Sequence, residues 1–150
     1  MHIRRATPAD ARPLAELLGA IIARGGTTAM TQISRADMEA WIVSNPARSI
    51  MLIAENDAGE LLGFQSIEPH PNLPEDACDI ATFTRLSHAQ LGIGSALFNK
   101  MEPSARALGY DWINAAIRPV NTGGIAYYQS RGFERYDSTP GQILMCYDLR

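Results

Sequence analysis

The sequence predicts a single α/β domain, of the α+β kind, with a mixed and mostly antiparallel central sheet flanked by helices. The chain has 150 residues, 46% of them hydrophobic, which suits one domain with a sizeable core. Apolar residues recur at helical spacing in some segments and form short continuous runs in others. In order, these segments read β-α-α-β-β-β-α-β-α-β-β. No repeat or linker divides residues 1–150, so we expect one domain.

The first part of the chain predicts a short strand followed by two helices. The strand is expected at residues 2–5. Thr7 is a suitable N-cap for the first helix and Gly25 a suitable end. Ser34 begins a second helix, which Pro46 ends. The apolar face of the first helix is marked by residues three and four apart: Leu14, Leu17, Leu18, Ile21 and Ile22.

The middle of the chain predicts three strands. Residues 49–55 form a buried apolar run, and N-D-A-G at 56–59 is typical of a hairpin turn. Residues 60–68 return as the second strand, and the proline-rich segment 68–76 is a loop. Residues 77–85 form a third, long strand.

The last part predicts two helices and three strands. The helix at 93–108 contains Pro103, which we expect to interrupt or kink it at a cost of about 3 kcal/mol. A shorter helix follows at 122–131. The remaining strands are expected at 110–117, 133–137 and 143–149.

Composition excludes several classes of protein. The net charge is −3, which argues against nucleic acid or a membrane surface as partner, since both attract basic proteins. The apolar runs are much shorter than the roughly 20 residues that span a bilayer, and no apolar leader is present. Cys78 and Cys146 are far apart, which predicts neither a disulfide framework nor a metal site. We therefore expect a soluble cytoplasmic protein without a metal.

A glycine-containing turn is the first functional signal. The segment G-I-G-S-A-L at 92–97 follows a strand and opens a helix. Glycines let a backbone turn tightly and approach a ligand, and the free amides of a helix N-terminus attract phosphate. The segment matches neither a P-loop nor a dinucleotide fingerprint. A tight turn without a ligand is the alternative interpretation.

A second motif completes a family pattern. Residues 121–133 read N-T-G-G-I-A-Y-Y-Q-S-R-G-F, and the strand W-I-N-A-A-I separates them from the glycine turn. With the opening I-R-R-A-T-P-A-D-A, the chain resembles the GNAT superfamily of acetyl-CoA-dependent N-acetyltransferases over nearly its whole length. The resemblance implies the GNAT fold, acetyl-CoA as cosubstrate and no metal.

The resemblance also implies which residues bind the cofactor. The backbone of Thr82, Phe83 and Thr84 would contact the pantetheine arm, and Asn121 would lie near the thioester. The pyrophosphate would bind the loop formed by Gln90, Leu91, Gly92, Ile93, Gly94 and Ser95. Ala89 departs from the pattern, because the family usually has Arg or Gln there. Gln90, one residue later, is a partial substitute.

Tyr128 matches the family's tyrosine general acid. The leaving thiolate needs a proton, and a tyrosine with a pKa near 10 holds one at neutral pH. The alternative is an aromatic ring packed on the sheet. Tyr127, its neighbour, is interpreted as a packing or surface residue.

The general base is less well defined by the sequence. In some relatives a carboxylate occupies the position of Cys78, and in others that of Ala116. Asp79 is the candidate here, although one residue reverses the strand face unless a bulge restores it. Glu68, His70 and ordered water are further candidates for the base. The alternative interpretation of Asp79 is a solvated carboxylate at the end of a strand, without a catalytic role.

The sequence thus predicts an enzyme that acetylates the primary amine of a small molecule by direct attack in a ternary complex. The phosphinothricin-type enzymes, which acetylate amino-acid-like compounds, are one subgroup that the pattern resembles. The alternatives are an acyl-CoA-binding module without turnover and an enzyme that acetylates protein N-termini or lysines. The residues leave the oligomeric state open, a homodimer included.

Overall fold

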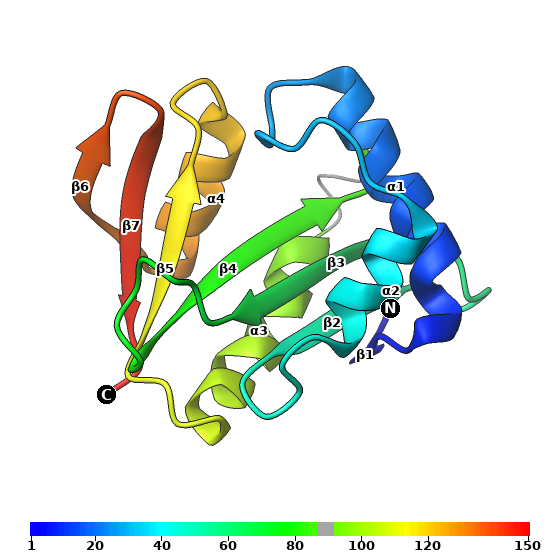
Figure 1. Ribbon diagram of the computed structural model, residues 1–150, viewed down its shortest axis with the longest axis horizontal. Helices are drawn as coiled ribbons and strands as arrows, with labels where there is room; N and C mark the ends of the chain where they lie inside the picture. The colour runs from blue at the N-terminus through cyan, green and yellow to red at the C-terminus, as the bar shows by residue number, and fades with distance from the viewer. Residues whose placement is uncertain (87–91) are drawn as a thin grey trace.

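A computed structural model describes residues 1–86 and 92–150. A seven-stranded sheet, in the order β1-β2-β3-β4-β5-β7-β6, runs through the molecule. Every neighbouring pair is antiparallel except β4 and β5, which are parallel. The strands are β1 His2–Arg5, β2 Ile50–Glu55, β3 Leu61–Glu68, β4 Ala77–Thr84, β5 Trp112–Ile117, β6 Glu134–Thr139 and β7 Gln142–Asp148 (Figure 1). The predicted fold class and element order are confirmed.

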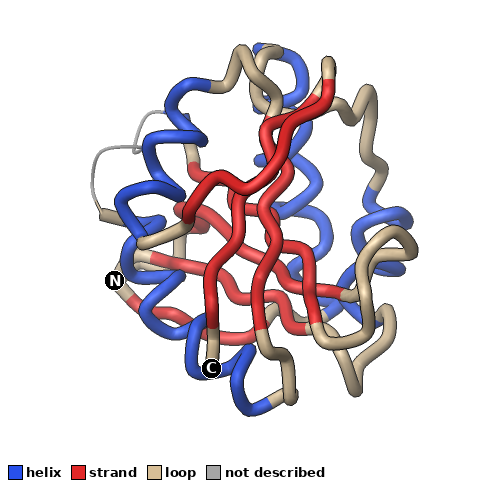
Figure 2. The backbone as a smooth tube through the Cα atoms, turned by 90° about the vertical axis from the view of Figure 1, so that its left-hand side faces the viewer, coloured by secondary structure: helices blue, strands red, loops and turns tan. Residues whose placement is uncertain are grey.

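Helices cover both faces of the sheet (Figure 2). They are α1 Ala11–Arg24, α2 Arg35–Val43, α3 Ile93–Ala107 and α4 Thr122–Arg131, and a short 3-10 turn at Pro8–Asp10 precedes α1. One core cluster lies between α1, α2 and the sheet and includes Met38, Phe64 and Phe83. The other joins α3 and α4 to the opposite face and includes Cys78 and Ile80.

Local signals explain most of the boundaries. Ser34 accepts a hydrogen bond from the Asp37 amide, and the Asp37 carboxylate accepts from the Ser34 amide, which is the capping box expected for α2. Gly25, with φ +80°, follows α1. The Asn56 side chain accepts from the amides of Ala58 and Glu60 and thereby fixes the predicted hairpin turn.

The expected interruption at Pro103 is wrong, because α3 continues through it from Ile93 to Ala107. The proline removes one amide donor from the ladder. Packing of the apolar face of α3 on the sheet, with Leu97, Met101 and Ala105 fully buried, outweighs this loss. Ser104, the next residue, donates its hydroxyl to the Lys100 carbonyl within the helix (2.8 Å).

Candidate active site

Strands β4 and β5 diverge (Figure 1), and a cleft lies beside the end of β4. Their pairing covers only Ala77–Asp79 and Trp112–Asn114. Beyond Asp79, β4 continues beside β3 alone, while β5 continues beside β7. Among the described residues, the edge of β4 from residue 80 to 84 therefore has no strand partner on the side of β5. Its backbone groups face the cleft and are available to a ligand.

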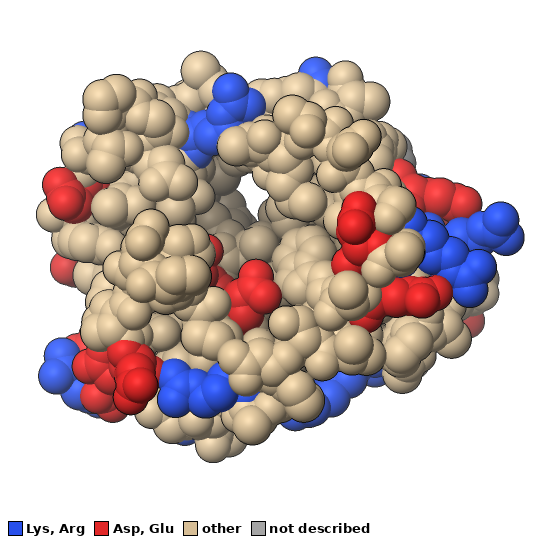
Figure 3. All heavy atoms as spheres, viewed as in Figure 1, with Lys and Arg blue, Asp and Glu red and all other residues tan. Residues whose placement is uncertain are grey.

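The cleft has a volume of about 560 Å³ and gathers residues from four segments of the chain, 21–27, 82–86, 94 and 120–127. An opening is visible in the middle of this face of the molecule (Figure 3). Five of the predicted binding residues line it: Thr82, Phe83, Thr84, Gly94 and Asn121. The other lining residues are Ile21, Arg24, Gly25, Gly26, Thr27, Leu86, Val120, Thr122, Gly123, Gly124 and Tyr127.

The glycine turn brings the N-terminus of α3 to the cleft. Gly92 is the N-cap and has the left-handed φ of +73°. The first helical bond runs from the Ala96 amide to the Gly92 carbonyl (3.0 Å). The amides of Ile93, Gly94 and Ser95 therefore precede the helical ladder and are of the kind that attracts anions. The predicted Gln90 and Leu91, like Ala89, lie outside the described residues.

The Tyr127 ring packs so closely on Gly94 that it leaves no room for a side chain there. A Cβ atom added to Gly94 would lie 2.6 Å from Cε1 of Tyr127. The Tyr127 hydroxyl donates to the Gly94 carbonyl (2.7 Å). Tyr127 packs against the core, as its interpretation as a packing residue expected, and it also lines the cleft. No signal in the sequence pairs it with a glycine that lies 33 positions away.

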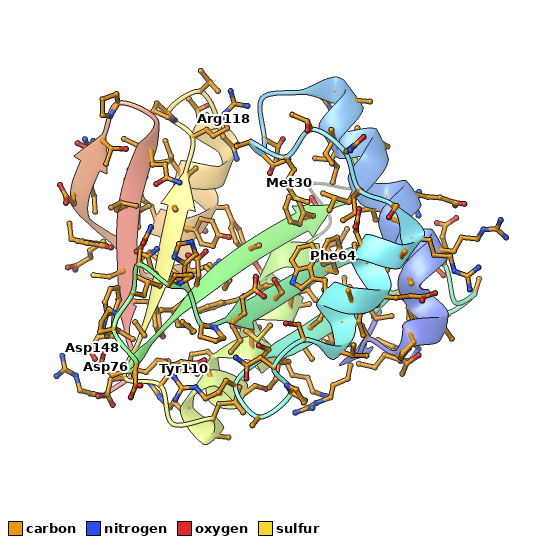
Figure 4. All side chains as sticks on the ribbon, in the orientation of Figure 1. Met30, Phe64, Asp76, Tyr110, Arg118 and Asp148 are labelled. Carbon is orange, nitrogen blue, oxygen red and sulfur yellow. The ribbon has the colours of Figure 1, made fainter. Side chains whose placement is uncertain are left out.

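Asn121 and Arg118 hold the loop between α1 and α2 against this side of the cleft. Asn121 caps α4 by accepting from the Gly124 amide (3.0 Å), and its amide group donates to the Thr27 carbonyl (3.4 Å). Arg118 donates to the Thr28 carbonyl (3.2 Å). Figure 4 shows Arg118 beside the loop that carries Met30. The wall of the cleft is thus tied across two distant parts of the chain.

Tyr128 lies in the core beneath β4 and is linked to the cleft through Thr82. Its side chain is buried, and its hydroxyl lies 2.8 Å from Oγ1 of Thr82, which lines the cleft. Burial raises the pKa of Tyr128 above its usual value, and the hydrogen bond with Thr82 offsets part of that rise. Tyr128 therefore carries its proton throughout the physiological pH range.

A buried glutamine connects these hydroxyl groups. Gln65 of β3 is fully buried, and its amide nitrogen donates to Thr82 Oγ1 (2.9 Å) and to the Tyr127 hydroxyl (3.1 Å). The sequence analysis missed this residue. A signal was available, because Gln65 is a polar side chain within an apolar strand run, and a buried amide needs partners.

Two carboxylates lie on the opposite face of the sheet, the face covered by α1 and α2. Asp79 and Glu68 are direct cross-strand neighbours. Burial raises the pKa of both; the charge of Asp79 raises that of Glu68 further, while neighbouring His70 offsets part of each rise. A hollow of about 440 Å³ lies at Glu68, lined also by Met30, Ala40, Trp41 and Ser44.

The predicted alternation along β4 decides which way Asp79 faces. The register between β4 and β5 is continuous across Cys78 and Asp79, so the bulge that would turn Asp79 to the face of Cys78 does not form. Cys78 lies in the core beneath α3, where burial raises the pKa of its thiol to about 12. Asp79 instead accepts from the Asn114 side chain (3.0 Å), which in turn accepts from the Tyr136 hydroxyl.

Within residues 1–86 and 92–150, no three His, Cys, Asp or Glu side chains come together as metal ligands. None of the helices described above has the length and apolar character to cross a membrane.

Comparison with known proteins identifies relatives of this arrangement. The model of the acetyltransferase (GNAT) family matches residues 21–133. A comparison with curated proteins found no significant match.

Solved structures with this fold are numerous. A putative acetyltransferase, yncA, from Salmonella typhimurium, solved with its cofactor acetyl-CoA, is 19% identical, with a TM-score of 0.90 over 100% of this chain and 94% of that one. A phosphinothricin acetyltransferase from Sinorhizobium meliloti in complex with AcCoA is 20% identical, with a TM-score of 0.88 over 98% and 87%. A ribosomal-protein-alanine N-acetyltransferase from Brucella melitensis is 21% identical, with a TM-score of 0.86 over 99% of each chain. At these identities the likeness concerns the fold.

Proposed function

The chain belongs to the GNAT family of acetyltransferases, and we propose that it transfers the acetyl group of acetyl-CoA to the primary amine of a small molecule. The observation that carries the proposal is the open edge of β4 beside the N-terminus of α3. The unpaired strand edge at residues 80–84 suits an extended amide-containing arm. The helix amides at Ile93, Gly94 and Ser95 suit a pyrophosphate. Acetyl-CoA has both groups in that order.

The residues of the cleft have separate tasks in this proposal. The amides of α3 and the edge of β4 bind and orient the cosubstrate, and Asn121 holds the wall of the cleft in place. When bound, acetyl-CoA supplies a thioester carbonyl that an amine can attack. Tyr128 donates its hydroxyl proton to the leaving sulfur. Its raised pKa keeps this proton in place until the sulfur becomes a strong enough base.

The amine approaches from the face of the sheet that carries Glu68 and Asp79. An ammonium group must lose a proton before it can attack, because its usual pKa is near 10.4. Glu68 and Asp79 attract the ammonium form and accept its proton, directly or through water. Asp79 thus keeps its role as a candidate base, although it faces away from Cys78.

The volume of the hollow at Glu68, about 440 Å³, favours a small acceptor. The hollow at Glu68 is lined by Met30 and Trp41, and Arg118 and Asn121 hold the adjoining loop in place. Such a hollow accommodates a compact amine with an apolar body.

Two measurements test the proposal. At 100 times its Kd, acetyl-CoA should stabilise the protein by about 2.7 kcal/mol, which raises Tm by about 5–10 °C in a domain of this size. Thiol release should then be followed across primary amines, amino acids and short peptides with free N-termini. Turnover with small amines supports the proposal. Binding without turnover on any acceptor would identify a binding module, and turnover restricted to peptides would identify a protein acetyltransferase.

A further inference from the structure

The buried amide of Gln65 controls a chain of hydrogen bonds that ends at Tyr128. Gln65 is 0% exposed, and both of its N–H groups are used, one on Thr82 Oγ1 and one on the Tyr127 hydroxyl. Its carbonyl oxygen is buried and has no partner among the described residues. An orphaned buried acceptor costs free energy, so a glutamine at this position calls for a compensating role.

The orientation of this amide follows from its neighbours. Tyr127 donates its only proton to the Gly94 carbonyl (2.7 Å), so it accepts from Gln65. The reversed amide would place the Gln65 oxygen against the Tyr127 oxygen with no proton between them. The amide nitrogen must therefore also face Thr82, which accepts its second proton.

The proton of Thr82 then has one described acceptor. Oγ1 of Thr82 is bonded to the Gln65 nitrogen and to the Tyr128 hydroxyl (2.8 Å). A nitrogen that donates cannot accept, so Thr82 donates to Tyr128. The hydroxyl proton of Tyr128 is consequently left over for another acceptor.

We propose that Gln65 is a positioning residue for acetyl transfer: it sets the direction of the Gln65–Thr82–Tyr128 chain so that the Tyr128 proton points away from Thr82 and toward the leaving sulfur. The inference rests on the proposed role of Tyr128 and deepens it. In the step concerned, the amine nitrogen bonds to the acetyl carbon and the carbon–sulfur bond breaks. Tyr128 Oη gives its proton to the sulfur, and the proton lost by the amine restores the hydroxyl through solvent.

Two substitutions of Gln65 separate direction from packing. Gln65→Glu keeps the shape but replaces the donor with an acceptor, so Thr82 donates to the new carboxylate and Tyr128 must donate to Thr82. We expect kcat to fall about 10–100-fold, part of the full worth of a general acid, while KM for acetyl-CoA stays within about twofold. Gln65→Met neither donates nor imposes a direction, and its kcat should lie between those of the wild type and Gln65→Glu.

A control separates lost stability from lost direction. Ile67→Val removes one methylene from a fully buried side chain of β3 that shares the face of Gln65. It should lower stability moderately and leave kcat at the wild-type value. If Ile67→Val loses as much kcat as a Gln65 variant of equal stability, the positioning role is wrong.

The closing experiment is a double-mutant cycle with Tyr128→Phe, measured by thiol release with acetyl-CoA and the best amine of the panel. If Gln65 acts through Tyr128, adding Gln65→Glu to Tyr128→Phe should change kcat less than twofold. Multiplied losses would overturn the positioning role and leave the general acid intact. A full kcat in Tyr128→Phe alone would instead remove the acid, and the role of Gln65 with it.

Discussion

Replacing Gly94 by alanine tests whether the glycine serves the tyrosine that packs on it. The added Cβ would lie 2.6 Å from Cε1 and 3.0 Å from Cζ of Tyr127, whereas carbon atoms in contact stay about 3.5–4.0 Å apart. The ring must therefore move by about 1 Å, which strains its 2.7 Å hydrogen bond to the Gly94 carbonyl. Overpacking of this kind costs about 1–3 kcal/mol. Unfolding in urea, followed by circular dichroism, measures that cost.

The expected fall in Tm is about 2–12 °C, from about 2–4 °C for each kcal/mol in a domain of this length. Because the displaced ring belongs to the cleft wall, Gly94→Ala should also abolish the rise in Tm that acetyl-CoA produces. Gly92→Ala is the matched control. A Cβ there meets nothing within 4 Å, and only the left-handed φ of +73° is unfavourable, by about 1–2 kcal/mol.

The clash itself is tested in a Tyr127→Ala background. With the ring absent, Gly94→Ala should be neutral or slightly stabilising, because alanine is more favourable than glycine within a helix by up to about 1 kcal/mol. An equal loss of stability in both backgrounds would refute the steric argument, because the two residues would then act independently.

Three further predictions concern the titrating groups. Tyr128→Phe should lower kcat about 10²–10⁴-fold while calorimetry finds the Kd for acetyl-CoA unchanged; a loss below tenfold, with chemistry rate-limiting, would exclude Tyr128 as the acid. Asp79→Asn should raise stability at pH 7 by about 1 kcal/mol, because burial raises the pKa of Asp79 and its charged form therefore opposes folding. This gain should vanish below about pH 4, where the carboxyl is protonated in both states. Asp10→Asn should lower stability instead, because the hydrogen bonds from Arg4 lower the pKa of Asp10 and favour its charged form. Near neutral pH the wild type should be more stable than the variant by about 1 kcal/mol. Urea titrations should find this difference lost as the pH falls below 3.8.

The parts of the fold that could be predicted depend on local signals. The capping box at Ser34, the turn at Asn56 and the stop at Gly25 act over a few residues, and the structure has all of them. Pro103 misled the prediction for the opposite reason. Its local cost is real, but the burial of α3 on the sheet is a long-range contribution that local rules do not include.

Residues of the site could be predicted only where the family motif or the two-residue alternation of a strand indicated their position. The family pattern pointed to Thr82, Gly94 and Asn121, which line one cleft, and the period of two correctly separated Cys78 from Asp79. The divergence of β4 from β5 was accessible only through the resemblance. Pairing between strands separated by a helix is decided by tertiary packing, which a single sequence does not display.

The role of Tyr127 shows how packing and binding share one residue. The Tyr127 ring needs a glycine at position 94, and its hydroxyl needs a donor, which Gln65 provides. The same donor fixes the amide that faces Thr82 and hence the hydroxyl contact of Tyr128. One buried amide therefore links the start of α3, where the phosphates would bind, to the hydroxyl that we propose protonates the leaving sulfur. Removal of a donor or acceptor from this network should lower the stability of the fold, because a buried polar group that loses its partner costs free energy until the network rearranges.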